Sequence, residues 1–296
     1  DELETFKTAI QRSQGVVLVT GPTGSGKTTS LYAALQHIKC ETKNIVTIED
    51  PIEYLIDGIN QLQLSRFKDV TFTTGLRSIL RQDPDVIMVG EIRDKETAEI
   101  AFRASLTGHL VFSTLHTNSA VSSVTRLLNI GLEPYLISSS VSLLVAQRLV
   151  RMICPSCKEQ CIPDPELLKK FKGYLRGARL QRFYKGKGCE HCNFTGFYGR
   201  TSIFEIMKVD DRIKELIFNK ASESLILKQA TNNGMKTLVE SGIVKVMAGI
   251  TTLDEVAKVT EVVEERKEVS DLLDQVDRIV KSSLDRPEEK SSFAES

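Results

Sequence analysis

The feature that most constrains the fold is a glycine-rich segment that lies between an apolar run and a helical pattern. Residues 16–20 are apolar and mostly β-branched, which is typical of a buried strand. The segment 21–29 reads GPTGSGKTT, and the apolar spacing from Leu31 to Ile38 predicts a helix directly after it. A strand, a tight turn and a helix in this order indicate an α/β domain with a parallel sheet.

The glycine-rich segment fits the pattern G-x-x-x-x-G-K-[ST], in which backbone N–H groups and the start of a helix surround phosphate. Lys27 is expected to reach the β- and γ-phosphates, and the Thr28 hydroxyl to ligate Mg²⁺. An ordinary glycine-rich turn is the alternative, but such a turn would not require this strand and helix on its two sides. We therefore predict a segment that binds the phosphates of a nucleoside triphosphate, made of Gly21, Pro22, Thr23, Gly24, Ser25, Gly26, Lys27, Thr28 and Thr29.

The bulk composition narrows the class of protein. The 296 residues carry a formal net charge of zero, which argues against nucleic acid as the main partner. No apolar run approaches the roughly 18 residues that cross a bilayer, and no signal segment opens the chain. Because the chain begins at Asp1 without a methionine, we expect it to be a fragment of a longer protein.

Apolar runs and helical patterns alternate over residues 1–150, which predicts an α/β core with a largely parallel sheet. We expect further strands at 44–48, 61–64, 86–89 and 110–112, and helices at 73–82 and 95–106. Ligands of such sheets bind at the carboxyl ends of the strands. Polar clusters stand at these ends, in 20–28, 49–53, 90–93 and 113–118.

The acidic residues of these clusters are candidates for hydrolysis of the γ-phosphate of a bound nucleoside triphosphate. Glu91 follows the strand 86–89, which is the place of the acidic Walker B residue near Mg²⁺. The alternative is that Glu91 caps the strand and pairs with Arg93. Either Glu53, our first choice, or Glu49, our second, could hold the attacking water.

Histidine and arginine side chains supply the remaining candidates. His116 follows the strand 110–112 and is either a γ-phosphate sensor, a subunit contact or a structural histidine. Positive charge could stabilise the transition state, including that of a neighbouring subunit's nucleotide. Each arginine could equally form a surface ion pair of little energetic value. The candidate arginines are Arg77, Arg81, Arg93 and Arg103.

Four of the six cysteines form two Cys-x-x-Cys pairs, which 31 residues separate. Two such pairs converging on one ion give a closed structural zinc site with four thiolates, here Cys154, Cys157, Cys189 and Cys192. A redox dithiol is the alternative, although it needs no second pair. The spare potential ligands are Cys161 and His191, and Cys40 is expected to be a buried, inert thiol.

Beyond the core the composition divides the chain into three further parts. Residues 151–200 are basic and hold the cysteine pairs, which predicts a small zinc-binding subdomain. Residues 201–260 predict a subdomain of short helices. Residues 261–296 form an acidic tail that is partly helical or disordered, with Val269, Leu272, Val276 and Ile279 at helical spacing.

With these residues assembled, the chain resembles the secretion ATPases of type II secretion systems and type IV pilus assembly. The match covers residues 5–255, and segment 21–29 corresponds to the family's Walker A box. The family's aspartate, Walker B and histidine boxes resemble residues 45–54, 76–98 and 107–118. The sequence Gln147-Arg-Leu-Val-Arg151 before the first cysteine pair resembles the entry to its zinc subdomain.

The resemblance implies a RecA-like P-loop core and a ring-shaped homohexamer that hydrolyses ATP between its subunits. Hydrolysis would drive assembly of a pilus or pseudopilus from the cytoplasmic side of the inner membrane. The implied partners are an inner-membrane platform and cytoplasmic docking proteins, and the family's upstream domains are expected to precede this chain.

Three alternatives to an assembly motor remain open. A pilus-retraction ATPase shares the same boxes, but the retraction enzymes as a family lack the cysteine pairs. A nucleotide-dependent nucleic-acid-binding protein would use the basic block 164–200 as its grip. A structural module gated by nucleotide is the third.

Overall fold

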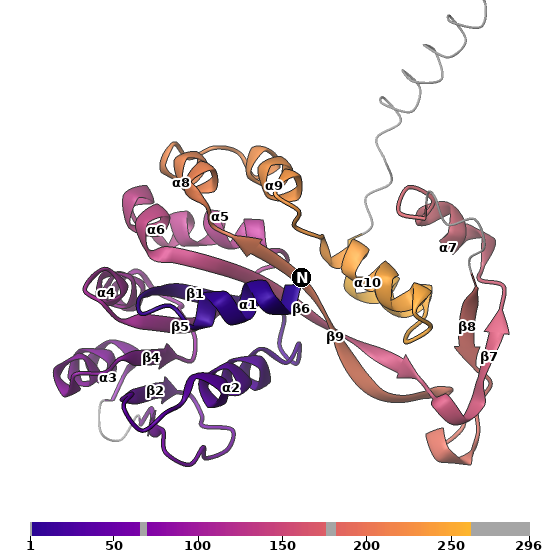
Figure 1. The fold of residues 1–296 in the computed structure, drawn as a ribbon, viewed down its shortest axis with the longest axis horizontal. Coiled ribbons are helices and arrows are strands. Elements are labelled where there is room, and N and C mark those ends of the chain that lie inside the picture. The colour runs from indigo at the N-terminus through magenta and orange to yellow at the C-terminus, as the bar shows by residue number, and fades with distance from the viewer. Residues whose placement is uncertain (1, 66–69, 176–181, 262–296) are drawn as a thin grey trace, which may run out of the picture.

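The computed structural model describes residues 2–65, 70–175 and 182–261. Its centre is a seven-stranded sheet of order β3-β2-β4-β5-β1-β6-β9 (Figure 1). All neighbouring pairs are parallel except β6 with β9. The strands are β1 Gly15–Thr20, β2 Ile45–Glu49, β3 Asn60–Gln63, β4 Val86–Val89, β5 Leu110–Leu115, β6 Val141–Ile153 and β9 Phe197–Lys208. The expected α/β fold with a largely parallel sheet is confirmed.

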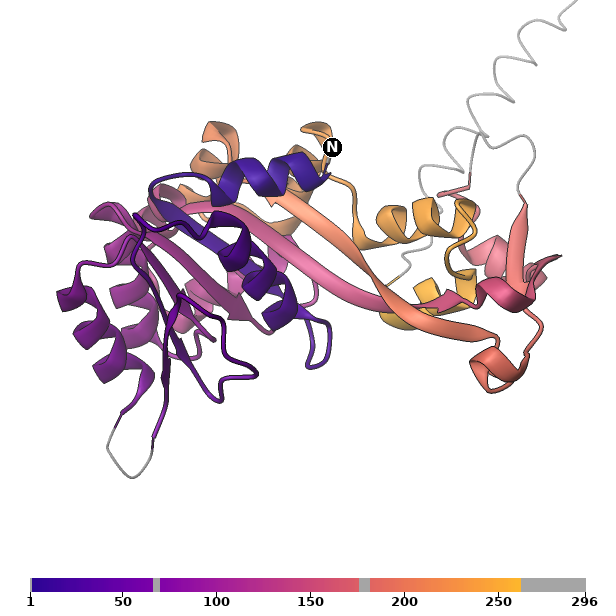
Figure 2. The ribbon, with the colours of Figure 1, turned by 60° about the horizontal axis from the view of Figure 1, so that its bottom comes forward.

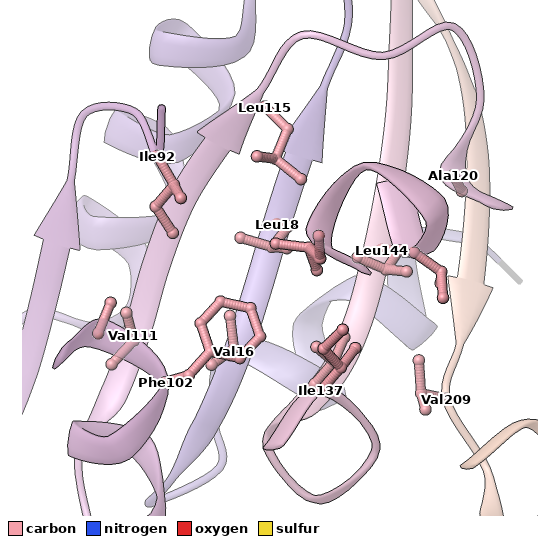
Figure 3. Packing of buried hydrophobic residues seen from close by; sticks show 14 of the residues in the cluster. Val16, Leu18, Ile92, Phe102, Val111, Leu115, Ala120, Ile137, Leu144 and Val209 are labelled. Atoms are coloured by element: carbon pink, nitrogen blue, oxygen red, sulfur yellow. The ribbon is translucent and has the colours of Figure 1, made fainter. Parts of the chain in front are cut away.

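Helices cover both faces of this sheet, because the central strands are apolar on both sides. Val17 and Val19 of β1 face the cluster that contains α1 and α2, and Val16 and Leu18 face the opposite cluster. Figure 3 shows Phe102 and Ile137 packed against Val16 on this second face. The helices are α1 Glu2–Ile10 and α2 Lys27–Ile38 on one face, and α3 Phe72–Ile79, α4 Lys95–Leu106, α5 Ala120–Ile130 and α6 Pro134–Ser140 on the other.

Strands β6 and β9 continue beyond the sheet as a long two-stranded ribbon (Figures 1 and 2). The ribbon ends in a small module, here called the tip, which comprises the described residues 154–175 and 182–196. The tip contains a two-stranded sheet and one short helix. Its elements are η3 Pro155–Cys157, β7 Lys158–Cys161, α7 Pro165–Lys170, β8 Phe183–Gly186 and η4 Glu190–Cys192.

The ribbon joins regions that the sequence analysis divided at residues 150 and 200. Residue 150 lies inside β6 and residue 200 inside β9. The sequence predicts no strand at 197–208, because the apolar residues there occur as adjacent pairs and do not alternate with polar ones. Strand β9 pairs with β6, which lies about fifty residues earlier in the chain, so no hairpin turn next to β9 indicates a strand there.

The helices that follow the ribbon serve two different regions. Helices α8 Asp211–Phe218 and α9 Glu223–Asn232 add apolar residues to the core cluster. Helices α10 Leu238–Met247 and α11 Leu253–Val259 share a separate cluster with Phe171 and Phe183 of the tip. The proposed helix through Val269 and Ile279 lies outside the described residues, as does the acidic tail after Glu261.

Two other expectations concern exposure and length. Cys40 is exposed, so the expectation of a buried thiol is wrong. It follows the last turn of α2 at Ile38, where the chain leaves the apolar face of the helix. Within the three described segments, every helix is too short or too polar to cross a bilayer.

Candidate functional site

The glycine-rich segment forms a tight turn at the start of α2. Gly24 and Gly26 have φ values of 78° and 88°, which L side chains rarely adopt. A Cβ on Gly26 would lie 2.9 Å from the Gln147 side-chain nitrogen, so this position also lacks space. Gly26 is the N-cap of α2 and has no side chain that could cap the first N–H groups of the helix. The turn therefore offers unpaired backbone donors at the positive end of a helix, which suits phosphate.

The polar side chains of this turn also fit an anion. The Lys27 ammonium donates to the carbonyl oxygens of Gly21 at 2.8 Å and Pro22 at 3.1 Å. Burial lowers the pKa of Lys27, and the Glu91 carboxylate opposes that shift. Ser25 Oγ is buried without a partner among the described residues. A bound phosphate would accept hydrogen bonds from the Lys27 ammonium and from the buried Ser25 hydroxyl, which otherwise lacks a partner in the described part of the chain.

The turn opens onto a cleft of about 660 Å³ at the carboxyl edge of the sheet. The cleft brings together side chains from the start of α2, from the end of β2 and from the segments that follow β2, β4 and β5: Lys27, Thr28, Glu49, Glu53, Glu91, Arg93 and His116. Every polar cluster named from the sequence therefore contributes to one cavity. The lining residues that the sequence did not indicate include Leu149 of β6 and Arg200 of β9. The ribbon supplies both, so only the non-local pairing of β6 with β9 could have located them.

Glu91 lies between Arg93 and His116. It forms an ion pair with Arg93, and His116 Nε2 lies 3.6 Å from Glu91 Oε2. Burial lowers the pKa of His116, as do the charges of Lys27 and Arg93, while Glu91 raises it. The lowered pKa favours the neutral imidazole, which can accept or donate one proton. The pairing of Glu91 with Arg93 is compatible with a role for Glu91 in the cleft, because the Arg93 side chain is mostly exposed and can move away.

The two carboxylates considered for the attacking water have different surroundings. Glu49 is only 2% exposed, and its carboxylate accepts hydrogen bonds from Tyr32 and from Thr47 at 2.6 Å. Glu53 is exposed and lines the cleft. A water molecule in the cleft can therefore reach Glu53 more readily than Glu49.

Three of the candidate arginines lie away from the cleft. Arg77 of α3 pairs with Glu96 at 2.8 Å, and Arg81 donates to the Arg77 carbonyl at 3.1 Å. Arg103 is exposed on α4. Among the lining residues of the described chain, only Arg93 and Arg200 bring a guanidinium to this cleft.

The four cysteines of the two pairs meet at the end of the ribbon. Their sulfur atoms lie within 4.8 Å of one another, with separations of 3.8 Å for Cys157–Cys192 and for Cys189–Cys192 and of 3.9 Å for Cys154–Cys189. Four thiolates at about 2.3 Å from a tetrahedral zinc ion would be about 3.8 Å apart. The backbone N–H groups of Gly188 and Gly196 point at two of these sulfurs at 3.3 Å, as thiolates require. The cluster therefore fits zinc.

The spare potential ligands lie outside this cluster. Cys161 packs against the apolar cluster that joins the tip to α10 and α11. His191 stacks on Tyr198, with ring centroids 4.2 Å apart. The tetrad is the single group of three or more metal-ligating side chains found in the part of the chain that the structure describes.

Known proteins share this fold and these motifs. The family described as type II/IV secretion system protein matches residues 1–258. The chain is 52% identical over 259 residues to the type II secretion system ATPase E of Vibrio cholerae, covering 87% of this chain and 50% of that protein. It is 50% identical over 256 residues to the type IV pilus assembly ATPase PilB of Thermus thermophilus, covering 86% of this chain and 28% of that protein.

A solved structure of the pilus retraction motor PilT with bound ADP has the same fold. Its TM-score is 0.64 at 29% sequence identity, over 90% of this chain and 66% of that one. The chain spans about half the length of the type II secretion relatives that it matches. The comparisons confirm the resemblance inferred from the motifs, and the chain belongs to the type II/IV secretion system protein family.

Proposed function

We propose that this chain is the ATP-hydrolysing part of a motor that assembles a type IV pilus or a type II secretion pseudopilus. The observation that carries the proposal is the single cleft shared by Lys27, Glu53, Glu91 and His116. The names of the relatives, a type II secretion ATPase and a type IV pilus assembly ATPase, support it. The matched relatives are longer than this chain, so the activity of the whole protein is part of the proposal.

Five side chains of the cleft have roles in the proposed hydrolysis. Lys27 turns from its own loop carbonyls to the β- and γ-phosphates, and the backbone N–H groups at the start of α2 hold the same oxygens. Thr28 and Glu91 would hold Mg²⁺, which neutralises charge on the phosphates when bound. Glu53 orients the attacking water. Neutral His116 donates a hydrogen bond to the γ-phosphate, and its contact with Glu91 couples the position of Glu91 to the presence of that phosphate.

Positive charge from a neighbouring subunit completes the site in this proposal. Arg77 and Arg81 lie outside the cleft of their own chain and are exposed, which leaves them accessible to a second copy. A homohexamer would bring such residues to the next subunit's nucleotide, as transition-state stabilisation by an arginine in trans requires.

Zinc separates assembly from retraction among the candidate functions. The fit of the tetrad to four-thiolate zinc favours assembly, because the retraction enzymes as a family lack the cysteine pairs. The proposed site of action is the cytoplasmic side of the inner membrane, against a membrane platform and cytoplasmic docking proteins. Nucleic acid is not proposed as a partner, since the net charge is zero.

Phosphate release by the full-length protein tests the proposal. Lys27→Ala and Glu91→Gln should each lower hydrolysis at least about a hundredfold, the usual effect of losing one preorganised charge. Glu99→Gln is the matched control for Glu91→Gln, because it makes the same substitution at a glutamate of α4 outside the cleft. Glu99 pairs there with Lys95 at 3.5 Å. Wild-type hydrolysis by Lys27→Ala or Glu91→Gln would refute the assignment.

A further inference from the structure

The buried carboxylate of Glu49 is enclosed by donors from three separate elements. Tyr32 of α2 donates its hydroxyl to Oε2, and Thr47 of β2 donates to Oε1 at 2.6 Å. Gln61 of β3 donates its side-chain N–H to Oε1 at 3.2 Å. A carboxylate that is 2% exposed needs such donors, because burial without them costs several kcal/mol. The network therefore fixes α2, β2 and β3 relative to one another at this point.

The same glutamine also fastens the loop that carries Glu53. Its amide nitrogen lies 3.2 Å from the carbonyl oxygen of Tyr54, and its amide oxygen accepts the N–H of Ile56 at 2.6 Å. The ring of Tyr54 meets the ring of Tyr32 edge to face, with centroids 4.7 Å apart. The residues directly after Glu53 are thus held by Gln61 and Tyr32.

Tyr32 connects this loop to the phosphate-binding turn. It is fully buried on α2, five residues after Lys27, which corresponds to about 7.5 Å along a helix. The N-terminus of that helix faces the phosphate position, and its second turn contacts Glu49. The position of the Glu53 loop is therefore set relative to the helix that binds the phosphates.

We propose that Tyr32 and Gln61 are positioning residues for hydrolysis, which hold the Glu53 loop at a fixed distance from the phosphates through Glu49. The inference rests on the proposed function and names which residues outside the cleft's catalytic set control the reaction. Misplacement of a water-orienting group affects the transition state and hardly affects the binding of nucleotide. Loss of either residue should lower kcat and leave KM for ATP nearly unchanged.

The test compares Tyr32→Phe and Gln61→Leu with the full-length wild-type protein. We expect kcat to fall about tenfold to a hundredfold, while the Kd for ADP stays within about threefold. Tyr135→Phe removes the same hydroxyl from an exposed tyrosine on α6 and should leave kcat unchanged. A variant that loses ADP binding and thermal stability together with kcat would indicate a structural role only and would overturn the proposal, as would unchanged kcat in both variants.

A second comparison asks whether the effect passes through Glu53. In the Glu53→Gln background, Tyr32→Phe should lower single-turnover hydrolysis by less than about twofold, because the residue that it positions is already disabled. A full additional loss in that background would show that Tyr32 acts by another route.

Lys27→Ala in the same assay distinguishes failure of the proposed function from failure of this inference. If Lys27→Ala hydrolyses ATP as fast as wild type, the proposed function fails; if only Tyr32→Phe and Gln61→Leu match wild type, this inference fails alone.

Discussion

The sheet core and the tip are connected by the same two strands, yet different interactions stabilise them. The core has large apolar clusters on both faces of its sheet, with fully buried side chains such as Phe102, Phe112 and Leu18. The tip has a small cluster around Phe171 and Phe183, to which α10 and α11 contribute most of the buried residues. The tip also contains the β7–β8 ladder and the sulfur tetrad, which fits a zinc ion.

This difference affects how each region presents its polar residues. In the core, burial of apolar strands builds the scaffold, and the site residues occupy the strand ends that the scaffold leaves open. In the tip the apolar cluster is small, and we propose that a zinc ion held by the four cysteines would supply much of the missing stability. Removing a functional residue should therefore leave the core folded, whereas removing a ligand should unfold the tip.

Loss of one zinc ligand is expected to have the largest effect. Cys189→Ser should reduce zinc content from about one ion per chain to none, since a structural site of this kind contributes about 10 kcal/mol or more to folding. The amides of Ile153 and Cys154, which bond to Ile250 and Gly196, should lose protection from hydrogen exchange. Nucleotide binding by the core should persist. Cys40→Ser, which removes an exposed lone thiol, is the control, and full zinc content in Cys189→Ser would contradict the assignment.

Truncation of a phenylalanine should act differently in the two regions. Phe102→Ala removes a fully buried ring of α4 and should lower the unfolding free energy of the core by about 3–5 kcal/mol. Phe171→Ala removes an equally buried ring beside α7, but the tip should keep its zinc and the core its full stability. Hydrogen exchange of the β1 and β5 amides in urea, measured together with zinc release, reports on both regions. Equal loss of core stability in the two variants would show that core and tip unfold as one unit.

Sequence patterns located most of the candidate site because of a general property of parallel sheets. Lys27, Glu91 and His116 each follow an apolar run, and the carboxyl ends of parallel strands meet at one edge. The positions of these residues along their strands therefore fixed their positions in space. The cysteine spacing was similarly informative, because two pairs define four ligands without knowledge of the chain between them.

The features that the sequence did not reveal depend on contacts between distant residues. Glu49 and Glu53 both lie near the carboxyl end of β2. Glu49 is the buried one because Tyr32 and Gln61 pack against it and donate hydrogen bonds to it, and the sequence does not show these contacts. The ribbon escaped prediction because β6 and β9 pair across the whole inserted tip. Arg200 reaches the cleft through that pairing alone. Non-local strand pairing leaves little trace in local propensity.

An ion pair at the base of the tip should contribute moderately to stability. Glu255 of α11 accepts hydrogen bonds from Arg151 of β6 at 2.7 and 3.0 Å, and these bonds hold its pKa at about 2, against an ordinary value of 4.5. Glu255→Gln should lower the free energy of opening at Ile153 by about 1–2 kcal/mol, as expected for a charged hydrogen bond on a buried carboxylate. Hydrogen exchange at that amide gives the value.

The pH dependence of this effect follows from the depressed pKa. The carboxylate of Glu255 contributes its full stabilisation above the unfolded pKa of 4.5 and loses it as the pH falls toward 2. The difference between wild type and Glu255→Gln should therefore stay constant from about pH 5 to pH 8. A difference that shrinks across that range would mean that the carboxylate titrates there and is not held by Arg151.

The smallest effect is expected from the same chemistry on the surface of the core. Arg77 and Glu96 lie 2.8 Å apart, but their side chains are 58% and 60% exposed, whereas Glu255 is only 7% exposed. Water solvates the Arg77 pair before and after it breaks, so Arg77→Gln should change the unfolding free energy by less than about 0.5 kcal/mol in urea denaturation. A loss above about 1 kcal/mol would show that burial does not separate the two pairs. With stability unchanged, any fall in ATP hydrolysis by the full-length Arg77→Gln protein must come from a contact that Arg77 makes outside its own folded chain.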